Sequence, residues 1–450
     1  MAHSRTSSYL RGFRWYRRSR LWVVPAAGAA AALLLASVSL SVDHFVLGEL
    51  GEDAPFPIFV GTPETVHSIL TLIGTAIATL TALVLTIVAV VIQLATQDLS
   101  PRAVRTFLQD AHSHLTIGTF VTTFTYALVV LQQFDRIAQE EDIVASTSMT
   151  LAFLLAVVSL GMFISYVDHI VHQSRVTSII DLIGNETRHV IEQMYPPEER
   201  AAHQRAGELP DRDPDQVIRS PQHGVILEID VPSLVRELAR EDAVVVTRPA
   251  VGDFIPCGDR LFEVYGGRPV DERTLSAAVE LDAERSIMQD VPFGFRLLID
   301  IAQRALSPGV NDPTTATQVV DQLHDLLRLL GSRPFPNGWH GDEEGVPRLF
   351  IPQPAWHVFV ALAFEEIRYH GGDSLQVVRR LRSVADNLIA ELPDDRHPPL
   401  HRQLQLLDQA AERGFPSDFE RAAASYPDAQ GIGSGGGFDP AIPTDPPDEA

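Results

Sequence analysis

Hydroxyl and amide side chains recur at helical spacing within two uncharged stretches, residues 66–97 and 115–134. Steps of four and seven residues place such side chains on one face of a helix. Two interpretations stay open: the hydroxyls line a hydrated pathway, or they join neighbouring helices by hydrogen bonds. The candidate residues are Thr71, Thr75, Thr79, Thr86, Gln93 and Gln97 in the first stretch and Thr116, Thr119 and Thr123 in the second.

A second group of candidates lies at a joint between two predicted helices, residues 293–306 and 314–330. One interpretation makes Asp312 a catalytic base or a metal ligand. The other, which we favour, is a capped turn, because Asp is a good N-cap residue and Pro suits the first position of a helix. The residues of this joint are Arg304, Ser307, Pro308, Asn311, Asp312 and Pro313.

The remaining chemistry-bearing residues give weaker patterns. His169 and His172 share a helical face, which fits an interfacial polar belt better than a metal site. The pair Glu366 and His370 has no third ligand at a recognisable spacing. We find no phosphate-binding loop, dinucleotide fingerprint, nucleophile elbow or zinc-protease motif. The sequence therefore predicts no metal and no cofactor, and it favours a protein that is not an enzyme.

The composition of the 450 residues narrows the classes further. The 35 basic residues are all arginine, which excludes Schiff-base chemistry and lysine-linked biotin or lipoyl groups. A net charge of −23 argues against a nucleic-acid partner. A single cysteine, Cys257, allows no internal disulfide.

Four uncharged runs predict a membrane domain over residues 21–172. The basic tail at residues 1–20, the arginines after the second run and the acidic segments after the first and third runs place the N-terminus and the C-terminal region in the cytoplasm. The second run would form a helix about 48 Å long, longer than the bilayer core. The predicted spans are residues 21–42, 66–97, 115–134 and 143–167.

The rest of the chain, which carries 26 arginines and 46 acidic residues from position 173 onward, predicts a cytosolic α+β domain. Its Gly-Asp turns resemble half of a biotinyl/lipoyl-type barrel, and an inserted helix makes the pattern similar to a β-hammerhead. Residues 277–288 are expected to form a helix. The expected parts are a helix and linker (173–215), a small β-rich barrel-like module (216–268), a helical domain (272–415) and a disordered tail (425–450).

Three segments carry a family resemblance: IQLATQDLSPRAVRTFLQD (92–110), LTIGTFVTTFTYALVVL (115–131) and IDIAQRALSPGVNDPTTA (299–316). They resemble the bacterial predicted membrane proteins grouped as domain of unknown function 2254, over about residues 20–415. The resemblance implies four N-terminal spans and a cytoplasmic C-terminal domain, and it implies no activity. The absence of Lys and the abundance of Ala and Arg indicate a high-GC bacterial genome, and the predicted spans then place the protein in the bacterial inner membrane.

The leading hypothesis is a homo-oligomeric inner-membrane protein that forms a channel-like pathway for ions or small solutes, with a cytosolic regulatory module. The alternative is a membrane scaffold or sensor that transports nothing and whose acidic cytosolic domain recruits partners. A membrane-tethered enzyme with its site at the Asn311-Asp312 joint is a third reading. The expected partners are the lipid bilayer and further copies of the chain; the sequence names no protein partner.

Overall fold

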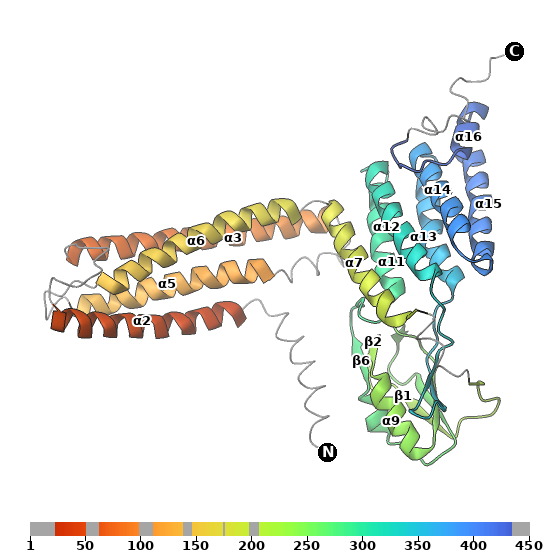
Figure 1. Cartoon of the computed structure of the whole chain (residues 1–450), viewed down its shortest axis with the longest axis horizontal. Coiled ribbons are helices and arrows are strands. Elements are labelled where there is room, and N and C mark those ends of the chain that lie inside the picture. The colour runs from red at the N-terminus through yellow and green to blue at the C-terminus, as the bar shows by residue number, and fades with distance from the viewer. Residues whose placement is uncertain are drawn as a thin grey trace. The chain divides into compact units, whose positions relative to one another are not determined.

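The computed structural model divides the chain between residues 175 and 176 into two compact units. The first is called the four-helix unit here and the second the C-terminal unit (Figure 1). The expected basic tail, residues 1–20, and the last part of the expected disordered tail lie outside the described residues. The structure describes residues 23–50, 63–98, 111–137, 146–173, 176–197 and 207–433.

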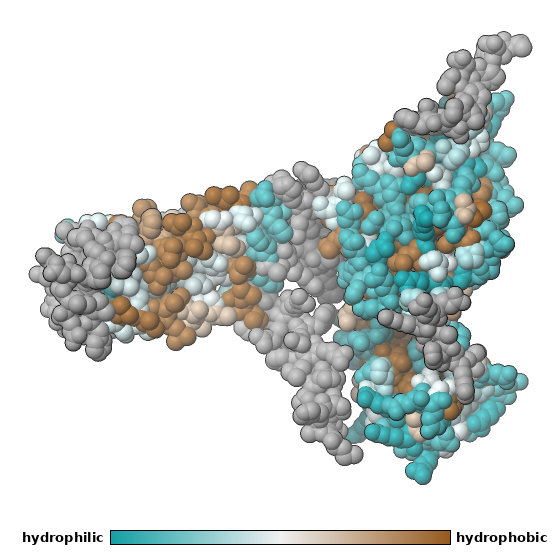
Figure 2. All heavy atoms as spheres, in the orientation of Figure 1, coloured by the Kyte–Doolittle hydropathy of each residue, from teal (hydrophilic) through white to brown (hydrophobic). Residues whose placement is uncertain are grey.

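Each helix of the four-helix unit is long and apolar enough to cross a membrane. Their apolar side chains form the brown surface over these helices in Figure 2. With 36 residues, α3 is about 54 Å long, well beyond the roughly 30 Å of a bilayer core. The four helices are α2 (Val23–Leu50), α3 (Pro63–Asp98), α5 (Ala111–Ile137) and α6 (Ser146–Gln173).

Helix α5 packs against each of the other three helices. Its contact with α2 is especially close, because two glycines let the backbones approach. A side chain at Gly28 would meet the Gly118 carbonyl oxygen at 2.8 Å, and one at Gly118 would meet Val24 at 2.8 Å. Phe120, Tyr126 and other fully buried side chains of α5 form the middle of this core.

The C-terminal unit begins with α7 (Val176–Met194), whose apolar side packs on two later helices, α11 (Val291–Ala305) and α12 (Pro313–Gly331). Thr187 of α7 is fully buried against Gly294 of α11, where any larger residue would collide with it. Thus α7, which follows α6 after two residues, is part of the helical core of this unit.

In the described part of the C-terminal unit, eight short strands form two sheets. The five-stranded sheet has the order β1-β5-β3-β8-β7, and the three-stranded sheet has the order β4-β2-β6. The barrel or hammerhead detail is not confirmed by this topology. The strands are β1 (Gln216–Arg219), β2 (Gly224–Ile229), β3 (Val244–Thr247), β4 (Phe254–Ile255), β5 (Arg260–Tyr265), β6 (Val279–Asp282), β7 (Trp339–Gly341) and β8 (Pro347–Phe350).

Strands from outside residues 216–268 complete both sheets. Strand β8 pairs in parallel with β3, with Val245 opposite Leu349, and β7 pairs with β8. Strand β6 pairs with β2, so the expectation of a helix over residues 277–288 is wrong. Val279 and Leu281 alternate with Glu280 and Asp282, the period of a strand with one apolar face.

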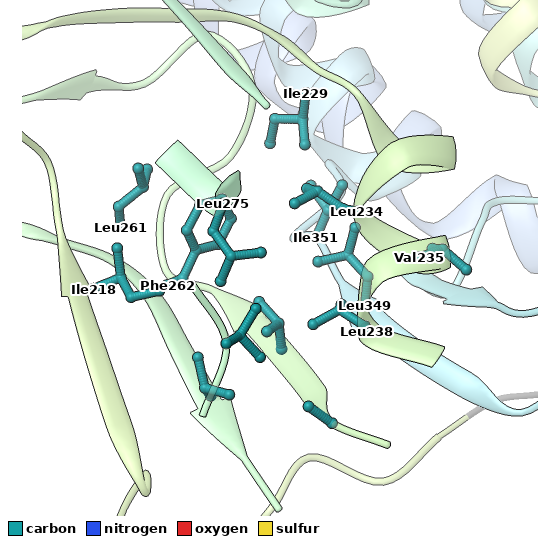
Figure 3. Close-up of a cluster of buried hydrophobic side chains, with 14 of the residues drawn as sticks. Ile218, Ile229, Leu234, Val235, Leu238, Leu261, Phe262, Leu275, Leu349 and Ile351 are labelled. Carbon is teal, nitrogen blue, oxygen red and sulfur yellow. The ribbon is translucent and has the colours of Figure 1, made fainter. Parts of the chain in front are cut away.

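Helix α9 (Val231–Glu241) covers the apolar cluster of these sheets. Figure 3 shows Leu234 and Leu238 of α9 pointing toward Leu349 and Ile351. The Asp230 side chain accepts a hydrogen bond from the Ser233 amide at 3.2 Å and so caps the helix. One face of α9 is thereby fixed in the core, and the other remains at the surface.

The helices after the sheets form a bundle with α7. An aromatic cluster at its base joins Tyr195, directly after α7, to Phe335 and Phe359, with ring centroids 5.4 and 6.1 Å away. Besides α11 and α12 and the short α10 (Glu272–Ser276), the unit contains α13 (Trp356–Gly371), α14 (Leu375–Glu391), α15 (His397–Gly414) and α16 (Asp418–Ser425).

Residues 426–433 fall where the composition predicts a disordered tail, yet they are tied to α14. Arg380 donates to the Ala429 carbonyl at 2.9 Å and pairs with Asp321 at 2.5 Å. Asp428 is buried and accepts the Gly431 amide at 3.0 Å. Arg379 also donates to backbone carbonyls of this segment. Hydrogen bonds from arginine side chains to the peptide groups of residues 426–433 therefore hold the segment against α14.

Candidate functional site

The polar face of α3 lies on the outside of the four-helix unit. Its threonine hydroxyls donate to carbonyls of their own helix, four residues back; Thr79 Oγ1 donates to the Thr75 carbonyl at 2.9 Å. This bond satisfies the hydroxyl without any neighbouring helix. Gln97 lies in α3, but its side chain is outside the described residues. The exposed members of this face are Thr71, Thr75, Thr79, Thr86 and Gln93.

The opposite side of α3 makes the contacts with its own unit. Apolar side chains there are at most 8% exposed, and they belong to the core of the four helices. The polar face therefore lies on the side of α3 that the described part of the chain leaves uncovered, beside exposed apolar residues such as Leu72 and Leu85. The buried apolar residues are Val66, Leu70, Ile73, Ile77 and Val84.

The threonines of α5 lie in different surroundings. Thr116 and Thr123 are fully buried, and Thr119 is half-buried. Thr123 Oγ1 lies 2.8 Å from Ser159 Oγ of α6, besides donating to its own helix. This pair joins α5 to α6, as the helix-joining interpretation requires. Within one chain the structure does not bring the polar face of α3 and the threonines of α5 to a common path.

A buried carboxylate that the sequence placed in an outer loop lies within α2. Asp43 is 4% exposed and accepts the amide of Thr147 at 2.9 Å and that of Ser148 at 3.0 Å. These amides belong to the first turn of α6, which has no carbonyl partners for them. Asp43 therefore caps a helix that follows it by about a hundred residues.

The same end of the unit holds a tyrosine among hydroxyls. Tyr126 Oη of α5 lies 2.8 Å from Ser39 Oγ of α2 and donates to the Ser148 carbonyl at 3.1 Å. With Asp43, this links three of the four helices through buried polar groups. The sequence does not predict this link, because the apolar runs indicate only where helices form; the local signal is the polar Ser146-Thr147-Ser148 start of α6.

Histidines lie together elsewhere on α5 and α6. The rings of His112 and His169 are 4.6 Å apart, and Ser165 Oγ lies 3.2 Å from His112 Nε2. The His172 side chain is outside the described residues. No group of three or more His, Cys, Asp or Glu residues that could hold a metal occurs among the described residues.

At the predicted joint, Asp312 is the N-cap residue of α12. Its carboxylate accepts the Thr315 hydroxyl at 2.6 Å and the Thr315 amide at 3.1 Å, and these bonds hold its pKa below the usual range. Asn311 has the left-handed backbone that completes the turn (φ 48°). Ser307 Oγ donates to the Arg304 carbonyl at 2.7 Å, and Pro313 occupies the first helical turn. Both Asp312 oxygens thus serve the helix, an arrangement that suits a joint better than a base.

Four helices long and apolar enough to cross a membrane, followed by a C-terminal unit of mixed sheets and helices, fit a membrane protein. The chain belongs to the domain of unknown function 2254 family (DUF2254), described as predicted membrane protein, whose model matches residues 18–387.

Relatives extend the similarity beyond the family model. Uncharacterized proteins of Mycobacterium bovis and of two strains of Mycobacterium tuberculosis (CDC 1551 and H37Rv) are each 28% identical over 420 residues. Each alignment covers 90% of this chain and 79% of the relative. No solved structure matches the chain significantly.

Proposed function

We propose that the protein forms a homo-oligomer in the bacterial inner membrane, in which the polar faces of α3 surround a path for ions or small solutes. The exposed position of that face is the observation that supports it. From Thr71 to Gln93 the face extends about 33 Å along the helix, close to the roughly 30 Å of a bilayer core. A polar face of this length would traverse the whole membrane.

The hydrogen bonds of this face are compatible with a pathway, although Thr116 and Thr123 of α5 make the same bonds to their own helix. The threonine hydroxyls donate their hydrogen bonds to carbonyls of their own helix, as Thr75 and Thr86 do at 2.8 Å. The hydroxyl oxygen then offers an acceptor and no donor. A row of acceptors suits water or a permeant cation, as in other selective pores. The acidic charge of the C-terminal unit would raise the local concentration of cations at a cytoplasmic entrance.

In this proposal the N-terminus and the C-terminal unit are cytoplasmic, and the C-terminal unit regulates the path. Helix α7 follows α6 after two residues and packs into the helical core of the C-terminal unit. A conformational change in that unit would therefore displace the end of α6 through the covalent connection between α6 and α7. The link is short enough to transmit such a displacement, because two residues extend at most about 7 Å.

Planar bilayers containing the purified full chain test this proposal. We expect conductance that Thr79→Val and Thr86→Val alter, since each removes an acceptor at nearly constant volume. Thr81→Val is the matched control: its hydroxyl also donates to its own helix, at 2.7 Å, but it lies about 200° away from Thr79 around α3. Silent bilayers, or equal effects of all three variants, would exclude the pathway.

A membrane scaffold or sensor is the second candidate. The packing inside one four-helix unit favours it, because Asp43 and Tyr126 are bonded across helices and Thr123 reaches Ser159 of α6. The β-rich part, whose turns resemble barrel-like adaptor modules, would then recruit a partner. In-cell crosslinking should recover one stable partner that is lost on deleting residues 216–415; recovery of none would reject this reading.

A further inference from the structure

A groove of about 740 Å³ lies between α9 and the β7–β8 hairpin of the C-terminal unit. Its volume is in the range of small-molecule sites. The helix contributes side chains from a single face, and the hairpin contributes the opposite wall. The lining includes Val235, Arg236, Ala239 and Arg240 of the helix and His340, Glu343 and Glu344 of the hairpin.

Ion pairs fix the shape of this groove. Arg348, whose side chain is 12% exposed, donates to Asp242 at the end of α9 at 2.7 Å and to Asp342 of the hairpin at 2.9 Å. The other Asp342 oxygen accepts the Glu344 amide at 3.1 Å and the Val346 amide at 2.9 Å. The hairpin is thereby clamped to α9, and a ligand would bind to walls that are already ordered.

The two walls carry opposite charges over an apolar floor. On the helix, Arg236 donates to the Pro232 carbonyl and the Ser233 hydroxyl, both at 3.1 Å, and no carboxylate pairs with it among the described residues. Among the described residues, the largely exposed Arg240 pairs with Glu237 of its own helix at 3.3 Å, a contact that stabilises little. On the hairpin, Glu343 and Glu344 are exposed and have no described ion pair.

His340 connects the groove to the end of α7. It lines this groove and also a smaller cavity of about 190 Å³ beside Met194 and Pro196. Burial lowers the pKa of His340, so the neutral imidazole offers one donor and one acceptor near pH 7. A molecule in the groove would therefore contact a residue that packs where α7 ends.

We propose that this groove binds a small dipolar molecule with a carboxylate at one end and an ammonium at the other. The carboxylate is held by Arg236 and Arg240, the aliphatic stem lies over Val235 and Ala239, and the ammonium is held by Glu343 and Glu344. A polyanion such as a nucleotide would meet the glutamates, and a polyamine would meet the arginines. Control of the membrane path by this ligand, through His340 and α7, rests on the proposed function; the binding site does not.

Isothermal titration calorimetry of the full chain in lipid nanodiscs tests the site. The probes are the ω-amino acids from glycine to 8-aminooctanoate, with hexanoate and hexylamine as analogues of 6-aminohexanoate that carry one charge. We expect saturable binding of at least one ω-amino acid, with the one-charge analogues about tenfold weaker or more. The site is rejected if none of the series binds, or if hexanoate or hexylamine binds as tightly as 6-aminohexanoate.

Variants then locate the binding. Arg236→Gln and the double change Glu343→Gln with Glu344→Gln should each weaken affinity about tenfold, whereas Arg402→Gln, an exposed arginine of α15 that does not line the groove, should not. Equal affinity in all three would place the ligand elsewhere and overturn the proposal. Conductance with and without the best probe separates the two ideas: binding in silent bilayers keeps the site and rejects the pathway.

Discussion

The threonines of α3 and α5 share a residue type, a helical period and a hydrogen bond to their own helix, yet they lie in opposite surroundings. Thr79 of α3 is exposed, and its hydroxyl bonds only within α3. Thr123 of α5 is fully buried and also reaches Ser159 of α6. In an apolar helix the periodicity identifies a polar face but not what that face meets, because lipid and protein interior are alike apolar.

The difference follows from where each helix packs. Helix α5 lies against all three of its neighbours, so most of its faces are covered. The described neighbours of helix α3 cover one apolar side of it, and its threonines lie among exposed residues such as Leu83 and Leu85 on the uncovered side. A face of threonines left outside is available to another copy or to water, whereas the same residues inside one unit fix its helices. This contrast predicts large effects for internal polar contacts and small stability effects on α3.

The largest effect should come from Asp43, the internal contact with two bonds to α6. In Asp43→Ala two buried amides of Thr147 and Ser148 lose a charged acceptor, so the free energy of unfolding should fall by about 2–4 kcal/mol. Unfolding in mixed micelles measures it. Glu64→Ala, an exposed acid in the first turn of α3, is the control and should change stability little. Equal losses in both variants would contradict the cap.

Loss of the Asp312 cap, which acts within its own helix, should lower the free energy of unfolding less than loss of the Asp43 cap, which joins two helices. Asp312→Ala removes the N-cap of α12 and should cost about 1 kcal/mol, while Asp312→Ser and Asp312→Asn retain most of it. Thermal unfolding of the full chain compares the three. A phenotype lost in Asp312→Ser and Asp312→Asn, with folding intact, would instead favour the enzyme reading of the joint.

The same carboxylate predicts a pH dependence. The pKa of Asp312 in the folded chain lies below that of the unfolded chain, because Thr315 donates to the charged form. Its stabilisation is therefore complete above the unfolded pKa of about 3.9 and is lost as pH falls through the lower, folded pKa. The stability difference between the parent chain and Asp312→Ala should shrink in that acidic window; a constant difference would contradict the assignment.

A comparison of one threonine from α5 with one from α3 should give the smallest stability effects. Thr123→Val leaves the buried Ser159 hydroxyl without its partner on α5 and should lower the free energy of unfolding by about 0.5–1.5 kcal/mol. Thr79→Val should change it by less than about 0.5 kcal/mol, as at other exposed positions. Unfolding in mixed micelles compares the two, and a larger loss for Thr79→Val would reverse the contrast.

Sequence periodicity predicts what depends on neighbours along the chain. The four apolar helices, the length of α3 and the cap at Asp312 all follow from residues within a few turns of each other. The cap by Asp43 does not, because its partner is 104 residues away. Val245 and Leu349, which pair between β3 and β8, are likewise 104 residues apart, and Arg380 bonds to carbonyls 48 and 49 residues further along the chain. The sequence does not predict strand β6, because its alternating polarity extends over only four residues and the surrounding residues favour a helix.

The most direct test of the account is the access of water to the outer face of α3. In a chain with Cys257→Ser, the variants Thr79→Cys and Thr86→Cys are compared in liposomes with Leu83→Cys and Leu85→Cys, exposed positions on either side of the polar face. A membrane-impermeant thiol reagent should label the threonine positions and change conductance, and it should leave the leucine positions unlabelled. Equal labelling at all four positions, or none at any, would contradict a water-filled path along α3.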